Sequence, residues 1–173
     1  GKPGSLDWEE PKRVAESVNT MGLSHAVITS VNRDDLNDGG SLFFAETIRE
    51  VKKFNNGCDV EVLIPDFKGD RAAINNIIEA SPEVINHNLE TVPRLQREIR
   101  TSASYGRSLS LLHYVKSQGF EGKTKTGLIV GMGESKEEVI AVLKDISKLD
   151  VDIVTIGQYL RPTAKHRPID RYA

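Results

Sequence analysis

The sequence predicts an α/β fold in which parallel strands alternate with helices. Five short apolar segments rich in β-branched residues are each followed by a polar or glycine-containing loop, and most of these loops lead into a stretch with helical spacing. No hairpin dipeptide joins one apolar segment directly to the next. Repeated units of this kind form right-handed βαβ crossovers, and their loops meet at the carboxyl ends of the strands, where such folds bind ligands.

Length and composition limit the class of protein. The 173 residues are enough for one domain and too few for a complete eight-unit barrel of roughly 250 residues. The formal net charge of −2 does not favour binding to nucleic acid or to an anionic membrane. No apolar stretch approaches the roughly 20 residues that span a bilayer. We expect a single domain over residues 1–173, truncated at both ends, with no nucleic-acid or membrane partner.

The first helix is expected to begin at residues 7–11, whose acidic side chains complement the positive end of a helix dipole. Its apolar residues Val14, Val18 and Met21 recur at helical spacing and predict one buried face. Gly22 is expected to end this helix.

A β-rich segment over residues 25–30 comes next, followed by a loop of Asp, Asn and Gly over residues 32–40. Ser41 is expected to cap the helix after this loop, because its hydroxyl can accept a backbone N–H. The buried face of that helix is predicted to contain Phe44, Ile48 and Val51.

The same pattern predicts four more strands, over residues 60–65, 84–89, 124–130 and 151–158. Helices are expected after Asp70, from about residue 107 to 118 following a longer connection through Pro93, and after Ser135. Ser135 and Glu138 have the spacing of a capping box. The two prolines Pro162 and Pro168 bracket a segment that cannot continue a helix. Periodicity alone does not separate a barrel from a flat sheet, but polar groups at nearly every strand exit favour an arc around one site.

One candidate binding feature lies at the exit of the strand over residues 84–89. Alternation in an extended chain places Asn86, Asn88 and Glu90 on one side, so that an amide and a carboxylate project together toward a ligand such as a vicinal diol. The alternative is that these polar residues only cap the turn that ends the strand.

A second candidate feature is the glycine-rich segment over residues 127–134. Gly127, Gly131 and Gly133 allow a planar ring or a phosphate to approach the backbone closely, and the alternative is that they serve packing alone. The sequence lacks the glycine fingerprints of dinucleotide-binding and P-loop proteins.

Other polar residues point less clearly to chemistry. Asp34, Asp35 and Asp38 could bind a cation or an ammonium group, or could form a solvated turn with helix caps. The four histidines lack metal-ligand spacing, and the single Cys58 cannot by itself hold zinc or an iron–sulfur cluster.

Five segments, taken in order, closely resemble the lipoyl synthase family of radical S-adenosylmethionine enzymes. They are TSVNRDDLNDGG (29–40), VLIPDFKGD (62–70), NHNLETVP (86–93), KTGLIVGMGE (125–134) and TIGQYLRP (155–162). The resemblance implies a partial parallel (βα)6 TIM-like barrel of the radical SAM type, missing its first strand and cluster loop.

The resemblance also implies which residues bind S-adenosylmethionine. The loop with Asp38 serves the methionine amino group, Asn88 and Glu90 match the ribose position, and the segment ending at Glu134 flanks adenine. Arg107 is the candidate for the methionine carboxylate because a guanidinium is a planar double donor, although a surface helix arginine is an equal alternative. The full implied set is Ser30, Asp38, Gly39, Gly40, Asn88, Glu90, Arg107, Gly127, Ile129, Gly131, Glu134 and Gln158.

The implied reaction inserts two sulfur atoms, at C6 and C8, into a protein-bound octanoyl chain. The implied cofactors are S-adenosylmethionine and two [4Fe-4S] clusters. The implied partners are octanoylated lipoyl carrier domains, namely 2-oxoacid dehydrogenase E2 subunits and the glycine cleavage H protein, with ferredoxin or flavodoxin as electron donor. The implied location is the cytoplasm, or the mitochondrion or plastid of a eukaryote.

The chain departs from this family in one respect. The family holds its radical cluster on a Cys-x-x-x-Cys-x-x-Cys loop that would precede residues 1–3, and no residue of this chain matches that loop or the ligands of the auxiliary cluster. The chain alone is therefore expected to be inactive, to expose an unpaired sheet edge, and to associate. The alternatives are an enzyme of the biotin synthase kind and a non-catalytic scaffold that binds S-adenosylmethionine or carrier domains.

Overall fold

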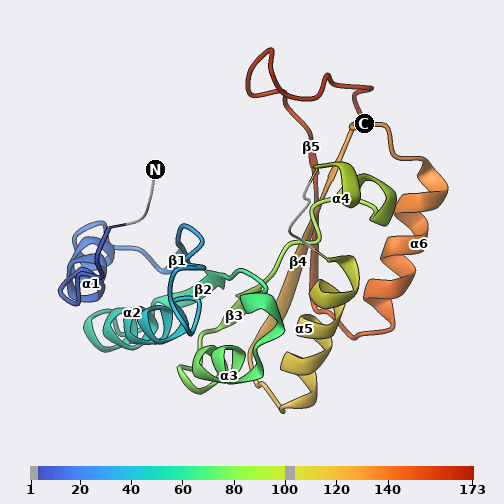
Figure 1. Ribbon diagram of the computed structural model, residues 1–173. Helices are drawn as coiled ribbons and strands as arrows, with labels where there is room; N and C mark the ends of the chain where they lie inside the picture. Colours follow the sequence, from blue (N-terminus) through green and yellow to red (C-terminus); the bar gives the residue numbers. More distant parts are fainter. Residues whose placement is uncertain (1–3, 100–103) are drawn as a thin grey trace. The chain divides into compact units, whose positions relative to one another are not determined.

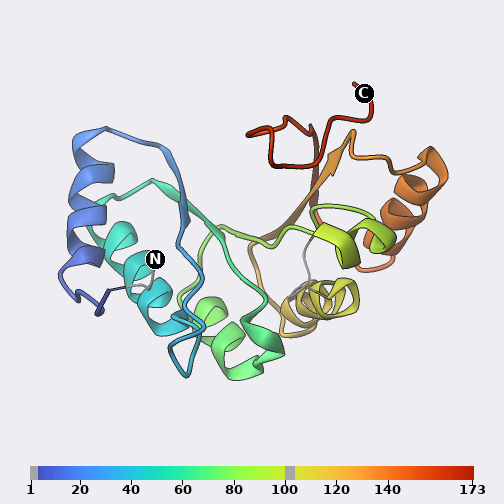
Figure 2. The same cartoon turned by 45° about the horizontal axis from the view of Figure 1, so that its top comes forward.

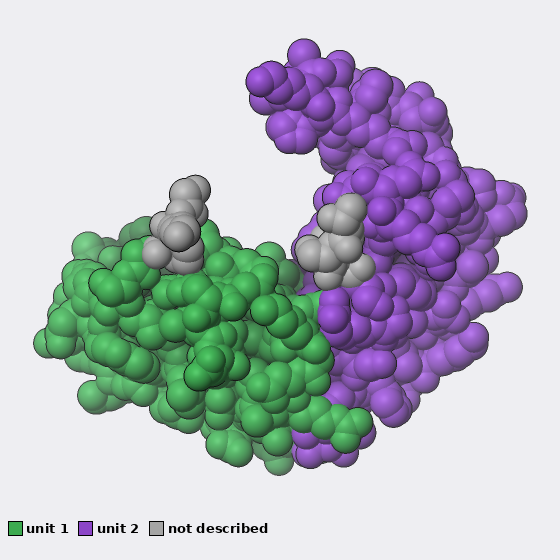
Figure 3. Space-filling view, in the orientation of Figure 1, with its two compact units in different colours: residues 1–86, 119–123 green, residues 87–118, 124–173 purple. Residues whose placement is uncertain are grey.

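The computed structural model describes residues 4–99 and 104–173, and these residues form two compact units (Figure 3). Unit 1 contains residues 1–86 and 119–123, and unit 2 contains residues 87–118 and 124–173. The predicted single-domain organisation stays a prediction. Within the described ranges, no helix is long and apolar enough to cross a membrane.

Unit 1 is a three-stranded parallel arrangement with its helices on one side (Figures 1 and 2). His25 of the first strand pairs with Asp59 of the second, and Glu61 of the second pairs with Val84 of the third. In chain order the elements are α1 (Glu10–Thr20), β1 (His25–Thr29), α2 (Ser41–Phe54), β2 (Asp59–Leu63), the short 3-10 helix η1 (Phe67–Gly69), α3 (Arg71–Glu79) and β3 (Val84–Asn86).

Unit 2 contains two further parallel strands and three helices (Figure 1). Lys125 of the first of these strands pairs with Ile153 of the second. The elements are α4 (Pro93–Ile99), α5 (Tyr105–Ser117), β4 (Lys123–Val130), α6 (Lys136–Ser147) and β5 (Ile153–Gln158). The strand order follows the chain, from β1 to β5, in one parallel sheet. The predicted parallel α/β class and all five strands are therefore confirmed.

Each unit has its own apolar core. In unit 1, buried residues of α2, β2 and α3 pack between the strands and the helices, among them Ile48, Val60, Val62, Ile74 and Ile77. In unit 2, the loop after β3 joins α4, β4 and α6 through Leu89, Val92, Leu95, Leu128, Met132, Val142 and Ile146. Burial of side chains of this size contributes about 1.5–3 kcal/mol each. These cores hold the carboxyl ends of the strands in place.

Two details of the first helices differ from the sequence expectation. Met21 is 63% exposed, and the buried face of α1 is formed by Pro11, Ala15 and Val18. Ser41 does not cap α2. Instead the Asp38 carboxylate accepts the Leu42 N–H at 2.9 Å, because the chain turns through the left-handed Gly40 before the helix begins.

The connection after β3 also differs from the expectation. Pro93 begins α4 instead of marking an irregular link, because the first turn of a helix does not need the N–H that proline lacks. The strand β3 ends at Asn86, three residues earlier than expected. The predicted capping box of Ser135 and Glu138 is confirmed at the start of α6.

Candidate functional site

The segment that follows β3 packs closely against the glycine of β4. A Cβ atom at Gly127 would lie 2.7 Å from Asn88 Oδ1 and 3.1 Å from Thr155 Oγ1. Because ordinary Cβ atoms do not approach oxygen this closely, only glycine at this position lets the Asn88 amide and the Thr155 hydroxyl lie over the strand backbone. The contacts at Gly127 therefore favour the packing alternative for this glycine.

Glu90 leaves the extended conformation that alternation predicts. Its φ is +65°, in the left-handed region that non-glycine residues rarely adopt. Its backbone N–H donates to Gly127 O at 2.9 Å, and its carbonyl accepts the Ile129 N–H at 2.6 Å. The expectation that Asn86, Asn88 and Glu90 share one side of a strand is wrong, because Asn86 ends the strand and donates to Glu61 instead.

The Asn88 amide and the Glu90 carboxylate are partly buried, and neither makes a hydrogen bond or an ion pair within the described part of the chain. An amide beside a carboxylate, both partly exposed, can bind a ligand that offers both donors and acceptors. A ribose diol is such a ligand, since each hydroxyl can donate to a carboxylate and accept from an amide. This observation supports the assignment of Asn88 and Glu90 to a nucleoside.

The glycine loop after β4 is organised by Glu134. Gly131 and Gly133 have φ of +101° and +99°, and the Glu134 side chain lies beneath them with 2% exposure. Its Oε1 accepts the Gly131 N–H at 2.7 Å, and its Oε2 accepts the Met132 N–H at 2.9 Å. Burial alone would raise the Glu134 pKa, but these donors outweigh it and lower the pKa below 4.5. Both carboxylate oxygens serve the loop, so Glu134 shapes the site through the backbone.

The C-terminal segment contacts the same loop. Arg171 Nη2 lies 2.9 Å from Glu134 Oε1, and Nη1 donates to the Glu134 carbonyl at 2.7 Å. The Asp170 N–H donates to Gly131 O at 2.9 Å, and Gln158 Nε2 donates to Arg171 O at 3.1 Å. The Gln158 amide is thus hydrogen-bonded to the C-terminal segment of the same chain. Sequence reasoning missed Arg171, because nothing local to residue 171 indicates a partner 37 positions earlier.

In unit 1, the loop before α2 uses its acids for structure. Asp38 Oδ1 accepts the Gly40 N–H at 3.1 Å, and Oδ2 accepts from Leu42 N and from Ser41 Oγ at 3.3 Å. Burial by itself would raise the Asp38 pKa. The hydrogen-bond donors have the larger effect, so the Asp38 pKa lies below its usual value. Gly39 and Gly40 both have positive φ. The helix-cap alternative for Asp38 is therefore correct, and the carboxylate sets the path of the two glycines.

The other acids of this loop form ion pairs. Arg33 binds Asp35 through two bonds of 2.9 and 2.8 Å, and Lys68 Nζ lies 3.1 Å from Asp34. Within residues 4–99 and 104–173, no group of three or more His, Cys, Asp or Glu side chains could hold a metal ion. The possible cation site at these aspartates has no support in the geometry.

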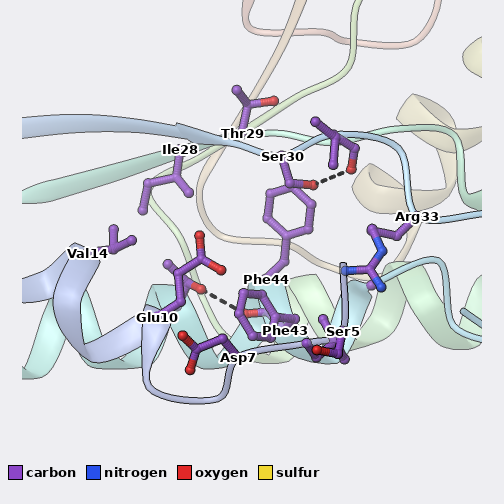
Figure 4. A pocket seen from close by; sticks show the side chains of 14 residues that line it. Ser5, Asp7, Glu10, Val14, Ile28, Thr29, Ser30, Arg33, Phe43 and Phe44 are labelled. Carbon is purple, nitrogen blue, oxygen red and sulfur yellow. Dashed lines mark hydrogen bonds between the residues drawn. The ribbon is translucent and has the colours of Figure 1, made fainter. Parts of the chain in front are cut away.

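A cavity of about 350 Å³ lies in unit 1 between α1, the end of β1 and the start of α2 (Figure 4). Ser30 lines it, with the hydroxyl donating to Val31 O at 2.9 Å, and so does Gly40. The floor is aromatic, formed by Phe43 and Phe44. Two of the proposed ligand-binding positions of unit 1 therefore border one hollow.

Two other predicted positions are placed as follows. Arg107 lies partly buried in the first turn of α5, which Ser104 caps through a 3.4 Å bond to the Arg107 N–H. Cys58 is buried, and its thiol pKa is raised by burial and by the nearby Asp59 and Glu83 carboxylates. The sequence has a single cysteine, and one thiolate cannot by itself hold a [4Fe-4S] cluster.

Comparisons with known proteins agree with this geometry. The Radical SAM superfamily matches residues 1–146. A lipoyl synthase of Rubrobacter xylanophilus is 56% identical over 172 residues, which are 99% of this chain and 54% of that protein. A mitochondrial lipoyl synthase of Nematostella vectensis is 51% identical over 99% of this chain and 59% of its own length. The chain thus spans little more than half the length of these relatives.

Solved structures show the same fold. HydG, a maturase of the [FeFe]-hydrogenase, has a TM-score of 0.76 at 17% identity, over 98% of this chain and 39% of its own. SuiB of Streptococcus suis, solved with S-adenosylmethionine bound, has a TM-score of 0.74 at 11% identity, over 99% of this chain and 38% of its own. At such low identity these likenesses establish the fold alone, and they agree with the predicted fold class.

Proposed function

The chain belongs to the radical SAM superfamily, and from that membership we propose that it is the S-adenosylmethionine-binding part of a lipoyl synthase. The reaction proposed for the whole protein is the insertion of sulfur at C6 and C8 of a protein-bound octanoyl chain. The observation that carries the proposal is the 56% identity to a lipoyl synthase, which extends over 99% of this chain. The match extends over 172 of the 173 residues.

The nucleoside end of the ligand is assigned to unit 2. The unpartnered Asn88 amide and Glu90 carboxylate would bind the ribose hydroxyls. Gly127, Ile129 and Gly131 are assigned to the adenine end from the resemblance of residues 125–134 to the lipoyl synthase family. Gln158 and Glu134 would act through the loop that they hold.

The methionine end is assigned to the loop before α2, together with Arg107. Gly39 and Gly40 would present the backbone that receives the ammonium group, with Asp38 holding their conformation and Ser30 beside them. The Arg107 guanidinium would pair with the methionine carboxylate through two parallel bonds. When bound, S-adenosylmethionine supplies a radical that abstracts hydrogen from unactivated carbon. The protein contributes binding, orientation and exclusion of water.

The remaining components come from outside this chain. A [4Fe-4S] cluster would supply the electron, and a second cluster would be the sulfur-donating substrate, with ligands that are not residues of this chain. The proposed acceptors are octanoylated lipoyl carrier domains, the E2 subunits and the H protein, and the proposed electron donor is a ferredoxin or flavodoxin. We propose a bacterial cytoplasmic or an organellar location; the relative from Nematostella vectensis is named a mitochondrial lipoyl synthase.

The proposal is tested with the protein produced anaerobically with its complete natural chain. Incubation with S-adenosylmethionine, a reductant and an octanoylated carrier peptide should replace two hydrogens of the octanoyl group by two sulfurs, as read by mass spectrometry. Conversion of dethiobiotin instead would indicate an enzyme of the biotin synthase kind. A protein that binds carrier peptide without iron or turnover would be the scaffold, and either result would refute the proposal.

The ribose assignment has its own test. Glu90→Ala should weaken S-adenosylmethionine binding about tenfold or more, because charge-assisted hydrogen bonds to a diol are lost. Glu137→Ala is the matched control, since Glu137 is exposed in the first turn of α6. Equal affinities of the two variants by calorimetry would remove Glu90 from the site.

A further inference from the structure

Gln96 of α4 is a buried amide that bonds to both sides of Glu90. Gln96 is only 2% exposed. Its Nε2 donates to Leu89 O at 2.6 Å and to Thr91 O at 3.4 Å. These two carbonyls belong to the residues immediately before and after Glu90. One side chain therefore holds both neighbours of the proposed ribose ligand.

The bonds that Gln96 makes are placed where the backbone needs support. Glu90 has φ of +65°, which an L-residue adopts only when its surroundings oblige it. The peptide groups of Glu90 are bonded to Gly127 and Ile129 of β4. That bridge sets the position of the backbone of Glu90. The Leu89 carbonyl accepts the Thr91 N–H at 2.8 Å as well as the Gln96 amide, and the Thr91 carbonyl accepts from Gln96. The direction of the Glu90 side chain follows from this combination.

Stability alone does not account for an amide at this place. Within residues 4–99 and 104–173, Gln96 Oε1 is buried without a hydrogen-bond partner, and so is the nearby loop hydroxyl Thr91 Oγ1. A buried acceptor without a partner is unfavourable, and an apolar side chain of the same length would avoid that cost. The feature that only an amide supplies here is the pair of donated hydrogen bonds.

We infer that Gln96 is a positioning residue for the ligand, which it does not touch, and that it acts by holding Glu90 in its left-handed conformation. The inference rests on the proposed function, because it takes Glu90 as the group that binds ribose. A solely structural Gln96 would fill space between α4 and the loop. Its loss would then change folding and leave the affinity for the nucleoside as it is.

The test uses the complete natural chain and the substitution Gln96→Met, which keeps the length of the side chain and removes its donors. Affinity is measured by calorimetry with S-adenosylhomocysteine, which contains the ribose and needs no reductant. We expect binding about tenfold weaker than in the unsubstituted protein. Hydrogen exchange of residues 89–91 should also become faster without ligand, and the melting temperature should fall, because the two carbonyls lose a buried donor.

A double-mutant cycle separates positioning from a direct contact. If Gln96 acts through Glu90, then Gln96→Met should weaken binding less than twofold in a chain that already carries Glu90→Ala. The matched control is Thr91→Val, which has nearly the same shape, lies in the same loop and removes a hydroxyl without a partner. It should bind as tightly as the unsubstituted protein.

Each outcome decides between the possibilities. Unchanged affinity of Gln96→Met, or an equal loss with and without Glu90→Ala, overturns the inference while leaving the proposed function intact. Absence of binding by the unsubstituted protein overturns the proposed function and the inference together. If Gln96→Met does not fold, Gln96→Asn shortens the side chain by one methylene and withdraws the amide from both carbonyls, and the same readouts apply.

Discussion

Replacing Glu134 is expected to release the glycine loop after β4. Its carboxylate is nearly inaccessible and accepts two backbone N–H groups, from Gly131 and Met132, at 2.7 and 2.9 Å. We consider Glu134→Ala, which removes both acceptors, and Glu134→Gln, which keeps one. Glu137→Gln, on the exposed side of the same helix turn, is the control.

The magnitude follows from these contacts. A hydrogen bond to a charged group contributes about 1.5–3 kcal/mol, so the loss of two such bonds costs about 3–6 kcal/mol of local stability. The ion pair with Arg171 adds little, because that side chain is 42% exposed and water replaces its partner. Glu134→Gln is expected to cost about half as much, and Glu137→Gln less than about 0.5 kcal/mol.

The assay is hydrogen exchange of the amides of residues 131 and 132 in the complete protein, together with its thermal unfolding. We expect both amides to exchange faster in Glu134→Ala by a factor that corresponds to the stated free energy. Identical exchange in Glu134→Ala and in the unsubstituted protein would refute the reasoning. So would equal effects of Glu134→Ala and Glu137→Gln.

The same carboxylate predicts an acid dependence. The Glu134 pKa is lowered in the folded protein, since the backbone donors outweigh the opposing effect of burial. Its contribution to stability is therefore complete above the ordinary value of 4.5 and is lost as the pH falls through the lowered folded value. Exchange at residues 131 and 132 should accelerate in that range, and should show no such step in Glu134→Gln.

Three further outcomes are expected. Gly127→Ala should displace the Asn88 amide and weaken S-adenosylhomocysteine binding about tenfold in calorimetry. It should cost less than about 1 kcal/mol of stability, because only side chains must move. Gly106→Ala is the control, since its added methyl group meets open space, and it should leave binding and stability unchanged. Asp152→Asn should cost about 1–2 kcal/mol in denaturant unfolding, because Lys116 Nζ at 2.7 Å and the Thr124 N–H at 2.8 Å lose a charged acceptor, and an unchanged midpoint would contradict this. The chain of 173 residues alone should associate in light scattering, and Val27→Lys on the exposed strand β1 should reduce the association; a monomer before substitution would oppose the edge argument.

Local sequence features predicted the elements well wherever the cause of the structure lies within a few residues. The capping box of Ser135 and Glu138 formed as expected, since both hydrogen bonds join positions three apart. Ser41 is one exception. Asp38 also lies near the start of α2, and the choice between two nearby caps depends on the path of the left-handed Gly40, which residue preference alone does not specify.

The candidate site was predicted in its composition and only partly in its geometry. Asn88, Glu90 and Gly127 were identified from the polar strand exit and the glycine pattern. Their relation, in which Gly127 makes room for Asn88 while β4 and Gln96 hold Glu90 in the left-handed region, involves residues up to 39 positions apart. Extended alternation was the best local guess for Glu90, and the bonds from β4 overrode it.

The sequence by itself determined the alternation of strands and helices, their parallel class, and the residue types present at each strand exit. Those properties depend on apolar spacing and turn chemistry within short windows of the chain. Only the tertiary structure decided that Glu134 meets Arg171, that Gln158 is occupied by the C-terminal segment, and that Gln96 brackets Glu90. Those contacts require the ends of different strands to be brought together first, and a buried polar group then takes whichever partner lies within hydrogen-bonding distance.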